Sequence, residues 1–259
     1  MRIKFIIPFP FDDEAIANRA AQIPRDVLSD DTEVECVPVK NSFAVDAPRV
    51  GGSYYEATIL DMYVIEAGIR AEGEGYDAVI MDTASDSGMY SLRSRLTIPV
   101  IGPGLVSYAV AAMLGKKFSI ITYGSEHKFL YGKILETYHL WEKCASVRAA
   151  DITPDFEDLF DSEGDEEFRR LTAEAQKAID EDGADVILLG STTMHEAGEY
   201  MGKHLDAPVI NPGPVAIKLA ETLVQLRLSH SKVAFPSPSM LQDEKYFSLA
   251  SAEEEVATS

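Results

Sequence analysis

The sequence has only two cysteines, Cys36 and Cys144, and they lie far apart in the chain. A disulfide framework needs several cysteine pairs, and a structural zinc site needs thiolate or imidazole ligands at short, regular spacings. The scarcity of cysteine therefore excludes a disulfide-stapled secreted domain and a cysteine-based zinc site. We interpret both cysteines as packing residues and expect the chain to fold without cross-links.

Basic residues are also few. The chain has 23 lysines and arginines against 43 aspartates and glutamates, which gives a formal net charge of -20 at pH 7. Nucleic acids and anionic membrane surfaces are bound by clustered lysines and arginines. We therefore expect neither of them as a partner. The densest acidic segment, residues 151–167, is interpreted as a solvated face.

Long hydrophobic runs are absent from the chain. The longest apolar stretches, such as Ala78–Met81 and Val186–Leu189, have the length of a strand and fall far short of the roughly 20 residues that cross a bilayer. The alternating residues 2–7 are typical of a first core strand and lack the profile of a cleavable signal peptide. We therefore expect a cytoplasmic protein without a membrane anchor.

No cofactor motif follows this first strand. A dinucleotide fingerprint would place a glycine-rich turn there, whereas the sequence has Pro8-Phe9-Pro10. Histidines, cysteines and aspartates do not recur at the spacings of metal ligands. We therefore predict neither a metal site nor a bound cofactor.

The chain does contain an internal repeat. Three segments of the first half match three segments of the second half in the same order. Each copy has a hydrophobic strand, a turn of small hydroxyl residues, a helix and a strand that begins at proline. The matched pairs are 2–7 with 117–122, 75–85 with 183–193, and 98–104 with 207–213.

This repeat predicts the fold, because strands that alternate with helices indicate parallel sheets with helices on both faces. We expect an α/β protein with two similar lobes related by a pseudo-twofold axis. Ligands of such sheets bind beyond the carboxyl ends of the strands. The matched loop residues Thr83 and Ser191 should then face each other across a cleft that contains the active site. The alternative is that the loops were retained for packing alone.

The lobes need not be contiguous in the sequence. We expect residues 1–104 and 213–259 to form the first lobe and residues 105–212 to form the second. The segment 227–232 is expected to pack back on the first lobe. The small and acidic residues 250–259 are expected to be a frayed tail.

The repeated segments resemble those of a known group. The sequences DAVIMDTASDSG (77–88), GADVILLGSTTM (183–194) and LSHSK (228–232) are similar to those of the aspartate/glutamate/hydantoin racemase superfamily. The resemblance spans almost the whole chain. It implies a cofactor-independent racemase or isomerase that acts on a small carboxylate, an amino acid or a cyclic imide such as a hydantoin. It also implies a homo-oligomer.

The resemblance further implies a pair of cysteines, one at the tip of each repeated loop. One thiolate removes the α-proton of the substrate, and the other thiol delivers a proton from the opposite face. Here Thr83 and Ser191 stand at these two positions. An aliphatic hydroxyl is far less acidic than a thiol, whose pKa is about 8.5. A symmetrical two-thiol racemisation therefore cannot operate unless other groups replace the thiols.

The candidate catalytic residues are Thr83, Ser191 and His195. If residues 192–203 form a helix, as their repeat partners 84–95 should, His195 lies one turn after Ser191. The two residues would then form a Ser–His pair suited to nucleophilic or proton-transfer chemistry. The alternative for His195 is a solvent-facing position at a helix start.

Several loop residues are candidates for binding the substrate. Backbone N–H groups at the starts of the two helices favour a carboxylate or an imide oxygen, although the hydroxyls there are equally suited to capping. Pro8-Phe9 forms an apolar wall, which indicates a substrate with a hydrophobic part, and Asp86 either caps a helix or orients a histidine. The candidate substrate-binding residues are Pro8, Phe9, Tyr54, Ser85, Asp86, Tyr123, Thr192 and Thr193.

Three functions follow from these observations and stay open at this point. The first is a racemase or isomerase of the usual kind for the family. The second is a hydrolase, lyase or decarboxylase on the same scaffold, with Ser191 in place of a cysteine. The third is a non-catalytic protein that binds a small molecule in the same cleft.

Overall fold

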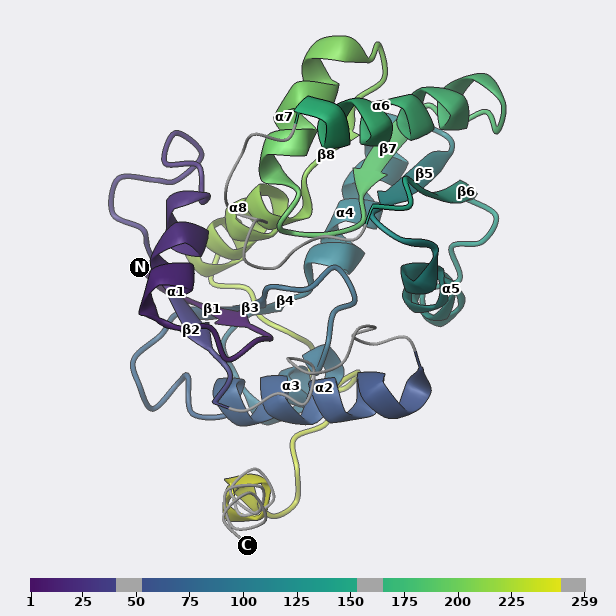
Figure 1. Cartoon of the computed structure of the whole chain (residues 1–259). Coiled ribbons are helices and arrows are strands. Elements are labelled where there is room, and N and C mark those ends of the chain that lie inside the picture. The colour runs from purple at the N-terminus through teal and green to yellow at the C-terminus, as the bar shows by residue number, and fades with distance from the viewer. Residues whose placement is uncertain (41–52, 153–164, 248–259) are drawn as a thin grey trace, which may run out of the picture.

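Two parallel sheets with helices on both faces make up the molecule (Figure 1). The structure is a computed structural model, and it describes residues 1–40, 53–152 and 165–247. The first sheet has the strand order β2-β1-β3-β4 and the second the equivalent order β6-β5-β7-β8. The predicted α/β class with two similar lobes is therefore confirmed. The strands are β1 (Arg2–Ile7), β2 (Glu33–Pro38), β3 (Ala78–Met81), β4 (Val100–Ile101), β5 (Phe118–Thr122), β6 (Cys144–Ala149), β7 (Val186–Leu189) and β8 (Val209–Ile210).

The central strands of each sheet bring the repeated loops together. The residues of β3 and β7 are all buried, as expected for parallel strands that are covered on both faces. Ile6 of β1 pairs with Met81 of β3, and Ile121 of β5 pairs with Leu189 of β7. The loops that follow β1 and β3 therefore leave the first sheet side by side, and the loops after β5 and β7 do the same in the second.

Two helices cross between the sheets. The helix α4 follows β4 of the first sheet but packs on β7 of the second, while α8 follows β8 and packs on β3 and β4. The helices α4 and α8 also pack against each other. The helices are α1 (Asp13–Ala21), α2 (Tyr54–Gly68), α3 (Met89–Arg95), α4 (Pro103–Leu114), α5 (Lys128–Thr137), α6 (Asp165–Asp180), α7 (His195–His204) and α8 (Pro212–Gln225).

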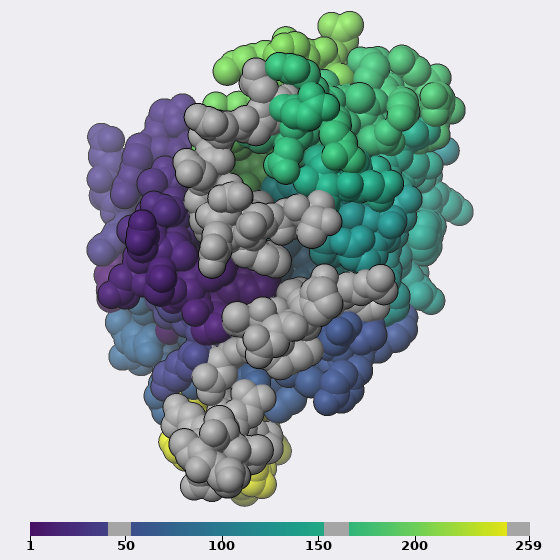
Figure 2. All heavy atoms as spheres, viewed as in Figure 1, coloured from purple at the N-terminus to yellow at the C-terminus, as the bar shows by residue number. Residues whose placement is uncertain are grey.

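Each sheet also has an apolar cluster on the face opposite to the one covered by α4 or α8. Residues of α2 and α3 pack with β1 and β3 in one cluster, and residues of α6 and α7 pack with β5 and β7 in another. In the space-filling view, the N-terminal residues and the teal to green residues form opposite sides of the molecule (Figure 2). These arrangements support our proposal that residues 1–104 and 213–259 form one lobe and residues 105–212 the other.

The segment after α8 returns to the first sheet. The backbone N–H of Val100 in β4 donates a hydrogen bond of 2.7 Å to Nε2 of His230. The ammonium group of Lys232 donates to the carbonyl oxygens at the end of α3, those of Arg93, Ser94 and Leu96. This lysine thus provides hydrogen-bond donors to carbonyl groups that have no partner within the helix. The LSHSK motif therefore attaches the segment after α8 to the first sheet through hydrogen bonds.

Two helices begin later than the sequence predicted. We expected helices over 84–95 and 192–203, whereas α3 begins at Met89 and α7 at His195. In the first loop, Asp86 and Gly88 have positive φ values of 56° and 70°, which a right-handed helix does not accept. In the second loop, the hydroxyl of Thr192 donates to the carbonyl oxygen of Asp82, so this residue contacts the first loop before the helix begins.

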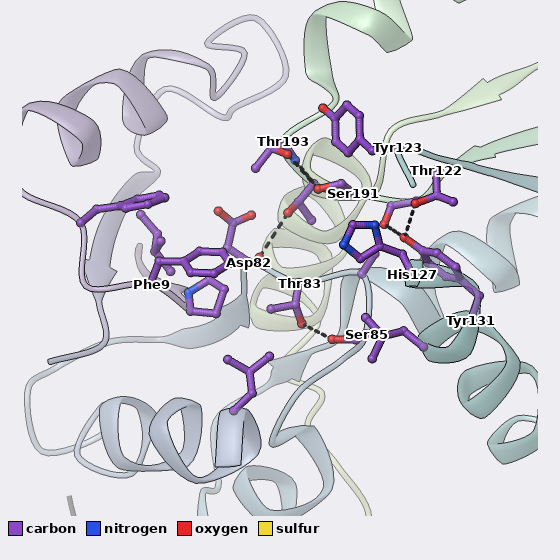
Figure 3. A pocket seen from close by; sticks show the side chains of 18 residues that line it. Phe9, Asp82, Thr83, Ser85, Thr122, Tyr123, His127, Tyr131, Ser191 and Thr193 are labelled. Carbon is purple, nitrogen blue, oxygen red and sulfur yellow. Dashed lines mark hydrogen bonds between the residues drawn. The ribbon is translucent and has the colours of Figure 1, made fainter. Parts of the chain in front are cut away.

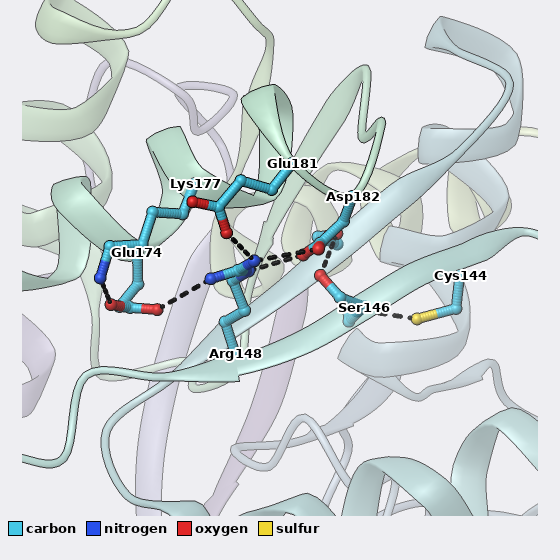
Figure 4. Close-up of polar contacts among 8 residues, drawn as sticks. Cys144, Ser146, Arg148, Glu174, Lys177, Glu181 and Asp182 are labelled. Atoms are coloured by element: carbon cyan, nitrogen blue, oxygen red, sulfur yellow. Dashed lines mark hydrogen bonds and ion pairs between the residues drawn. The ribbon is translucent and has the colours of Figure 1, made fainter.

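Acidic residues of the second lobe gather around one arginine (Figure 4). Arg148 of β6 donates hydrogen bonds to Glu181 and Asp182 at the end of α6 and lies within 3.4 Å of Glu174. Most of the acidic segment 151–167 lies outside the described residues. No described helix has both the length and the apolar character needed to cross a membrane.

Candidate functional site

A pocket of about 140 Å³ lies where the carboxyl ends of the two sheets meet (Figure 3). Its walls come from the loops that follow β1, β3, β5 and β7 and from the ends of these strands, together with one residue of α2 and two of α5. Aliphatic and aromatic side chains make up most of the lining. The lining residues are Ile7, Pro8, Phe9, Phe11, Leu60, Asp82, Thr83, Ala84, Ser85, Thr122, Tyr123, His127, Leu130, Tyr131, Gly190, Ser191, Thr192 and Thr193.

The loop after β3 presents the Thr83 hydroxyl to this pocket. The Oγ1 atom of Thr83 accepts hydrogen bonds from the hydroxyl of Ser85 and from the backbone N–H of Ser87, each at 3.2 Å. A hydroxyl has two acceptor sites and one proton. Because both acceptor sites of Thr83 are occupied, its proton remains available for a ligand.

The loop after β7 presents Ser191 in an equivalent way. Its Oγ accepts from the backbone N–H of Thr193 at 3.2 Å and shares a 2.8 Å hydrogen bond with the Thr193 hydroxyl. When Thr193 donates, the Ser191 proton is free to point into the pocket. Gly190 is required just before it, because a Cβ atom there would lie 2.9 Å from the carbonyl oxygen of Ile121.

A buried ion pair connects the two loops beneath the pocket. Arg19 of α1 forms two hydrogen bonds to the Asp82 carboxylate, at 2.7 and 2.8 Å, and a third to the carbonyl oxygen of Thr192 at 3.2 Å. The Thr192 hydroxyl in turn donates to the carbonyl oxygen of Asp82. Arg19 therefore fixes the first loop relative to the second. Neither Arg19 nor Asp82 was identified from the sequence, because their pairing depends on the folded chain.

His127 also lines the pocket and was missed by the sequence analysis. It ends the short 3₁₀ turn Ser125–His127, close in the chain to Tyr123, which was a candidate for binding the substrate. Its Nδ1 atom is buried and has no hydrogen-bond partner among the described residues. Burial lowers the pKa of the imidazole below its usual value, and the nearby Glu126 carboxylate only partly opposes this. The ring is therefore neutral at pH 7.

Two tyrosines complete the polar part of the lining. Burial raises the pKa of Tyr123 above its usual range, and burial raises the pKa of Tyr131 to about 12. The Tyr131 hydroxyl donates to the carbonyl oxygen of Gly190 and lies 3.3 Å from the Thr122 hydroxyl. Both phenols are therefore protonated at neutral pH, and neither can accept a proton from a ligand.

Three residues predicted for the site lie outside the lining. His195 begins α7, and its Nδ1 lies 2.8 Å from the Asn211 amide nitrogen. Its ring borders a different, much smaller cavity. Tyr54 is 61% exposed and packs edge-on against Phe129.

Asp86 is fully buried and holds the structure together behind the first loop. Its carboxylate accepts hydrogen bonds from the Tyr138 hydroxyl at 2.7 Å and from the backbone N–H groups of Gly104 and Leu105 at 2.8 Å. Burial raises the pKa of Asp86 to about 6 in spite of these donors. The carboxylate caps the start of α4 and connects it to the end of α5.

The described residues contain no cluster of three or more histidines, cysteines, aspartates or glutamates that could hold a metal ion. The two cysteines lie on the edge strands β2 and β6 and do not line the pocket. Burial raises the pKa of each thiol to about 11, so neither forms a thiolate near neutral pH. Cys144 donates instead to the carbonyl oxygen of Ser146 (Figure 4).

Comparisons with known proteins agree on one family. The family model described as Asp/Glu/Hydantoin racemase matches residues 15–220. A hydantoin racemase from a Pseudomonas species is 30% identical over 193 residues, which cover 72% of this chain and 76% of that protein.

Solved structures of two allantoin racemases are also similar. The protein from Klebsiella pneumoniae is 26% identical, with a TM-score of 0.79 over 93% of this chain and 96% of that one. The protein from Pseudomonas fluorescens is 26% identical, with a TM-score of 0.81 over 93% and 99% of the two chains.

Proposed function

Because the chain belongs to the Asp/Glu/hydantoin racemase family, we propose that it is an isomerase that removes and returns the proton of a carbon atom beside a carbonyl group. The proposed substrate is a small, uncharged cyclic amide of the hydantoin type with an apolar substituent. One observation carries this proposal. The Thr83 and Ser191 hydroxyls lie in a pocket whose described lining contains apolar side chains and no lysine or arginine.

The charge of the lining favours a neutral substrate. The carboxylate in the lining, Asp82, is already paired with Arg19. Two of the backbone N–H groups that the sequence offered to an anion have internal partners, because Ser87 donates to Thr83 and Thr193 to Ser191. Burying a carboxylate without a partner costs several kcal/mol. A neutral amide ring, by contrast, needs only neutral hydroxyls as hydrogen-bond partners. Hydantoin and allantoin, which the names of the similar racemases give as substrates, are rings of this kind.

The apolar wall favours a hydrophobic group on the ring. Phe9 and Phe11 stack with their ring centroids 5.4 Å apart, and Leu60 and Leu130 also line the pocket. An aromatic substituent gains contact area against these side chains, whereas a polar urea group would be desolvated there. We therefore propose that benzylhydantoin is a better substrate than allantoin.

The two loop hydroxyls have the chemistry of hydrogen-bond donors. When the carbon atom loses its proton, negative charge develops on the neighbouring carbonyl oxygen. Donors that are already aimed at this position stabilise the enolate without reorganisation. We assign this role to Thr83, whose acceptor sites are engaged within its own loop, and to Ser191, whose proton is free when the Thr193 hydroxyl donates to it.

The nucleophilic alternative lacks the base that the sequence predicted for it. A serine nucleophile needs a neighbouring group to take its proton. His195, the predicted partner of Ser191, lies outside the pocket lining and is hydrogen-bonded to Asn211. The geometry therefore does not support a Ser191–His195 pair, and the family favours an isomerase over a hydrolase.

A panel of single enantiomers tests this proposal. Circular dichroism should show that the protein racemises benzylhydantoin, acts on allantoin more slowly and leaves aspartate and glutamate unchanged. The assay is run with a chelator and without added cofactors, since none is expected to be needed. Phe9→Ala should raise the KM for benzylhydantoin more than the KM for allantoin. Racemisation of aspartate but of no hydantoin would refute the proposed substrate class.

Alkylation of the cysteines should leave this activity unchanged. Iodoacetamide reacts with thiolates, and both thiols are protonated and lie outside the pocket. The control is Ser191→Cys, which places a thiol in the pocket and should become sensitive to the reagent. Inactivation of the wild-type protein by modification of Cys36 or Cys144 would contradict our placement of the site.

A further inference from the structure

We propose that His127 is the side chain that accepts the proton from the substrate carbon, a role that rests on the proposed function. The imidazole lines the same pocket as Thr83 and Ser191 (Figure 3). It lies at the start of α5 in the second lobe and follows β5, whereas Thr83 follows β3 of the first lobe. The buried Nδ1 atom makes no structural hydrogen bond within the described chain.

The other polar groups of the described lining cannot take this role near neutral pH. The Asp82 carboxylate is held by two hydrogen bonds from Arg19. Tyr123 and Tyr131 keep their protons because burial raises the pKa of each phenol. Serine and threonine hydroxyls are weaker acids still, so their alkoxides are not accessible as bases. A neutral imidazole has a free lone pair and needs no further activation.

The surroundings keep the imidazole in this neutral form. The nearest carboxylate belongs to Glu126, 3.9 Å from Nδ1, and burial outweighs its effect on the pKa of His127. Asp82 is the other carboxylate of the lining, and its charge is balanced by Arg19. The remaining titratable residues of the described lining, Tyr123 and Tyr131, are uncharged near neutral pH. His127 is therefore available as a base at pH values where an exposed histidine would be partly protonated.

The proton-transfer step balances without a co-reactant. The C–H bond of the substrate breaks, an N–H bond forms on the His127 ring, and the electron pair moves to the carbonyl oxygen. Thr83 and Ser191 donate hydrogen bonds to the resulting enolate. The imidazolium then returns a proton to the carbon atom, and the N–H bond breaks as the C–H bond reforms.

A single base gives the reaction a measurable asymmetry. The protonated ring exchanges its proton with solvent. It then donates a solvent-derived proton to the same face of the substrate carbon. Inversion needs a proton from the opposite face, where water or a hydroxyl is a slower donor. In deuterium oxide, the substrate should therefore gain deuterium with retention faster than it inverts. A pair of thiols would instead couple each exchange to inversion.

His127→Asn tests the assignment. Proton NMR of enantiopure benzylhydantoin in deuterium oxide gives the exchange rate, and circular dichroism of the same sample gives inversion. We expect exchange to fall about 100-fold to 10,000-fold in the variant. In the wild type, kcat/KM should rise with pH through a midpoint below the ordinary histidine pKa of about 6.5. This acid limb should disappear in the variant, and added imidazole should restore part of the rate.

The matched control is His139→Asn. His139 is exposed on the turn after α5 and has a φ of 56°, a conformation that asparagine accepts. This variant should keep the wild-type rate. If His127→Asn retains both the exchange rate and the acid limb, the assignment is overturned while the isomerase proposal stands. If the wild type does not exchange the carbon-bound proton of any hydantoin, both the proposed function and the proposed role of His127 are wrong. If His127→Asn does not fold, a wild type without an acid limb overturns the assignment.

Discussion

Replacing Arg19 by methionine is expected to lower the free energy of unfolding by about 3 to 5 kcal/mol, because Asp82 then loses its partner inside the protein. The side chains of Arg19 and Asp82 are only 3% and 2% exposed. An uncompensated buried carboxylate is far more costly than the lost attraction alone. Urea unfolding followed by circular dichroism measures the change.

Two further variants separate this explanation from a general sensitivity to mutation. Arg2 pairs with Glu35, but their side chains are 42% and 45% exposed, so Arg2→Met should cost only about 0 to 1 kcal/mol. Arg19→Met combined with Asp82→Leu removes both charges and should recover most of the stability lost in the single variant. A single variant as stable as the wild type would show that the pair does not hold the two loops together.

The fold was predictable because the internal repeat indicates, from the sequence alone, that the same order of strands and helices occurs twice. Matching strands at 75–85 and 183–193 indicated two equivalent sheets, and both sheets have the same strand order. The prolines that begin the last matched strands precede β4 and β8, which lead into α4 and α8. Local patterns of this kind depend on hydrophobicity along the chain, and the sequence displays hydrophobicity directly.

The candidate site was less predictable, because its parts lie far apart in the sequence. Thr83 and Ser191 were found through the repeat, and their catalytic roles remain predictions. Arg19 and Asp82 could not be paired from the sequence, because only the folded chain places α1 beneath β3. His127 has no counterpart in the repeated motifs, although it lies close in the chain to the candidate Tyr123.

The helix starts show why residue spacing alone gave a different position for His195. His195 lies one helical turn after Ser191 only if the helix begins at Thr192. The Thr192 hydroxyl instead bonds to the carbonyl oxygen of Asp82, and α7 begins at His195 itself. Thr192 thus takes part in a contact between the two loops before α7 begins, and His195 lies at the helix start outside the pocket lining.

Ser191→Ala is expected to reduce kcat about 100-fold to 1000-fold, the usual effect of removing one donor to a developing oxyanion. The KM should change little, because the hydroxyl acts mainly on the enolate and not on the bound substrate. The melting temperature should also change little, since Ser191 bonds only within its own loop. Thr83→Ala should have a smaller effect on kcat. Ser91→Ala, which changes an exposed serine of α3, is the control for the substitution itself.

The turnover of Ser191→Ala on enantiopure benzylhydantoin, followed by circular dichroism beside the wild type, tests most directly whether the chemistry occurs between the two repeated loops. Our account predicts a folded protein with the wild-type melting temperature, a nearly unchanged KM and a kcat reduced by the two to three orders of magnitude expected for a lost oxyanion donor. Full wild-type turnover in this variant would contradict the account, because Ser191 would then only cap its own loop and the reaction would take place elsewhere.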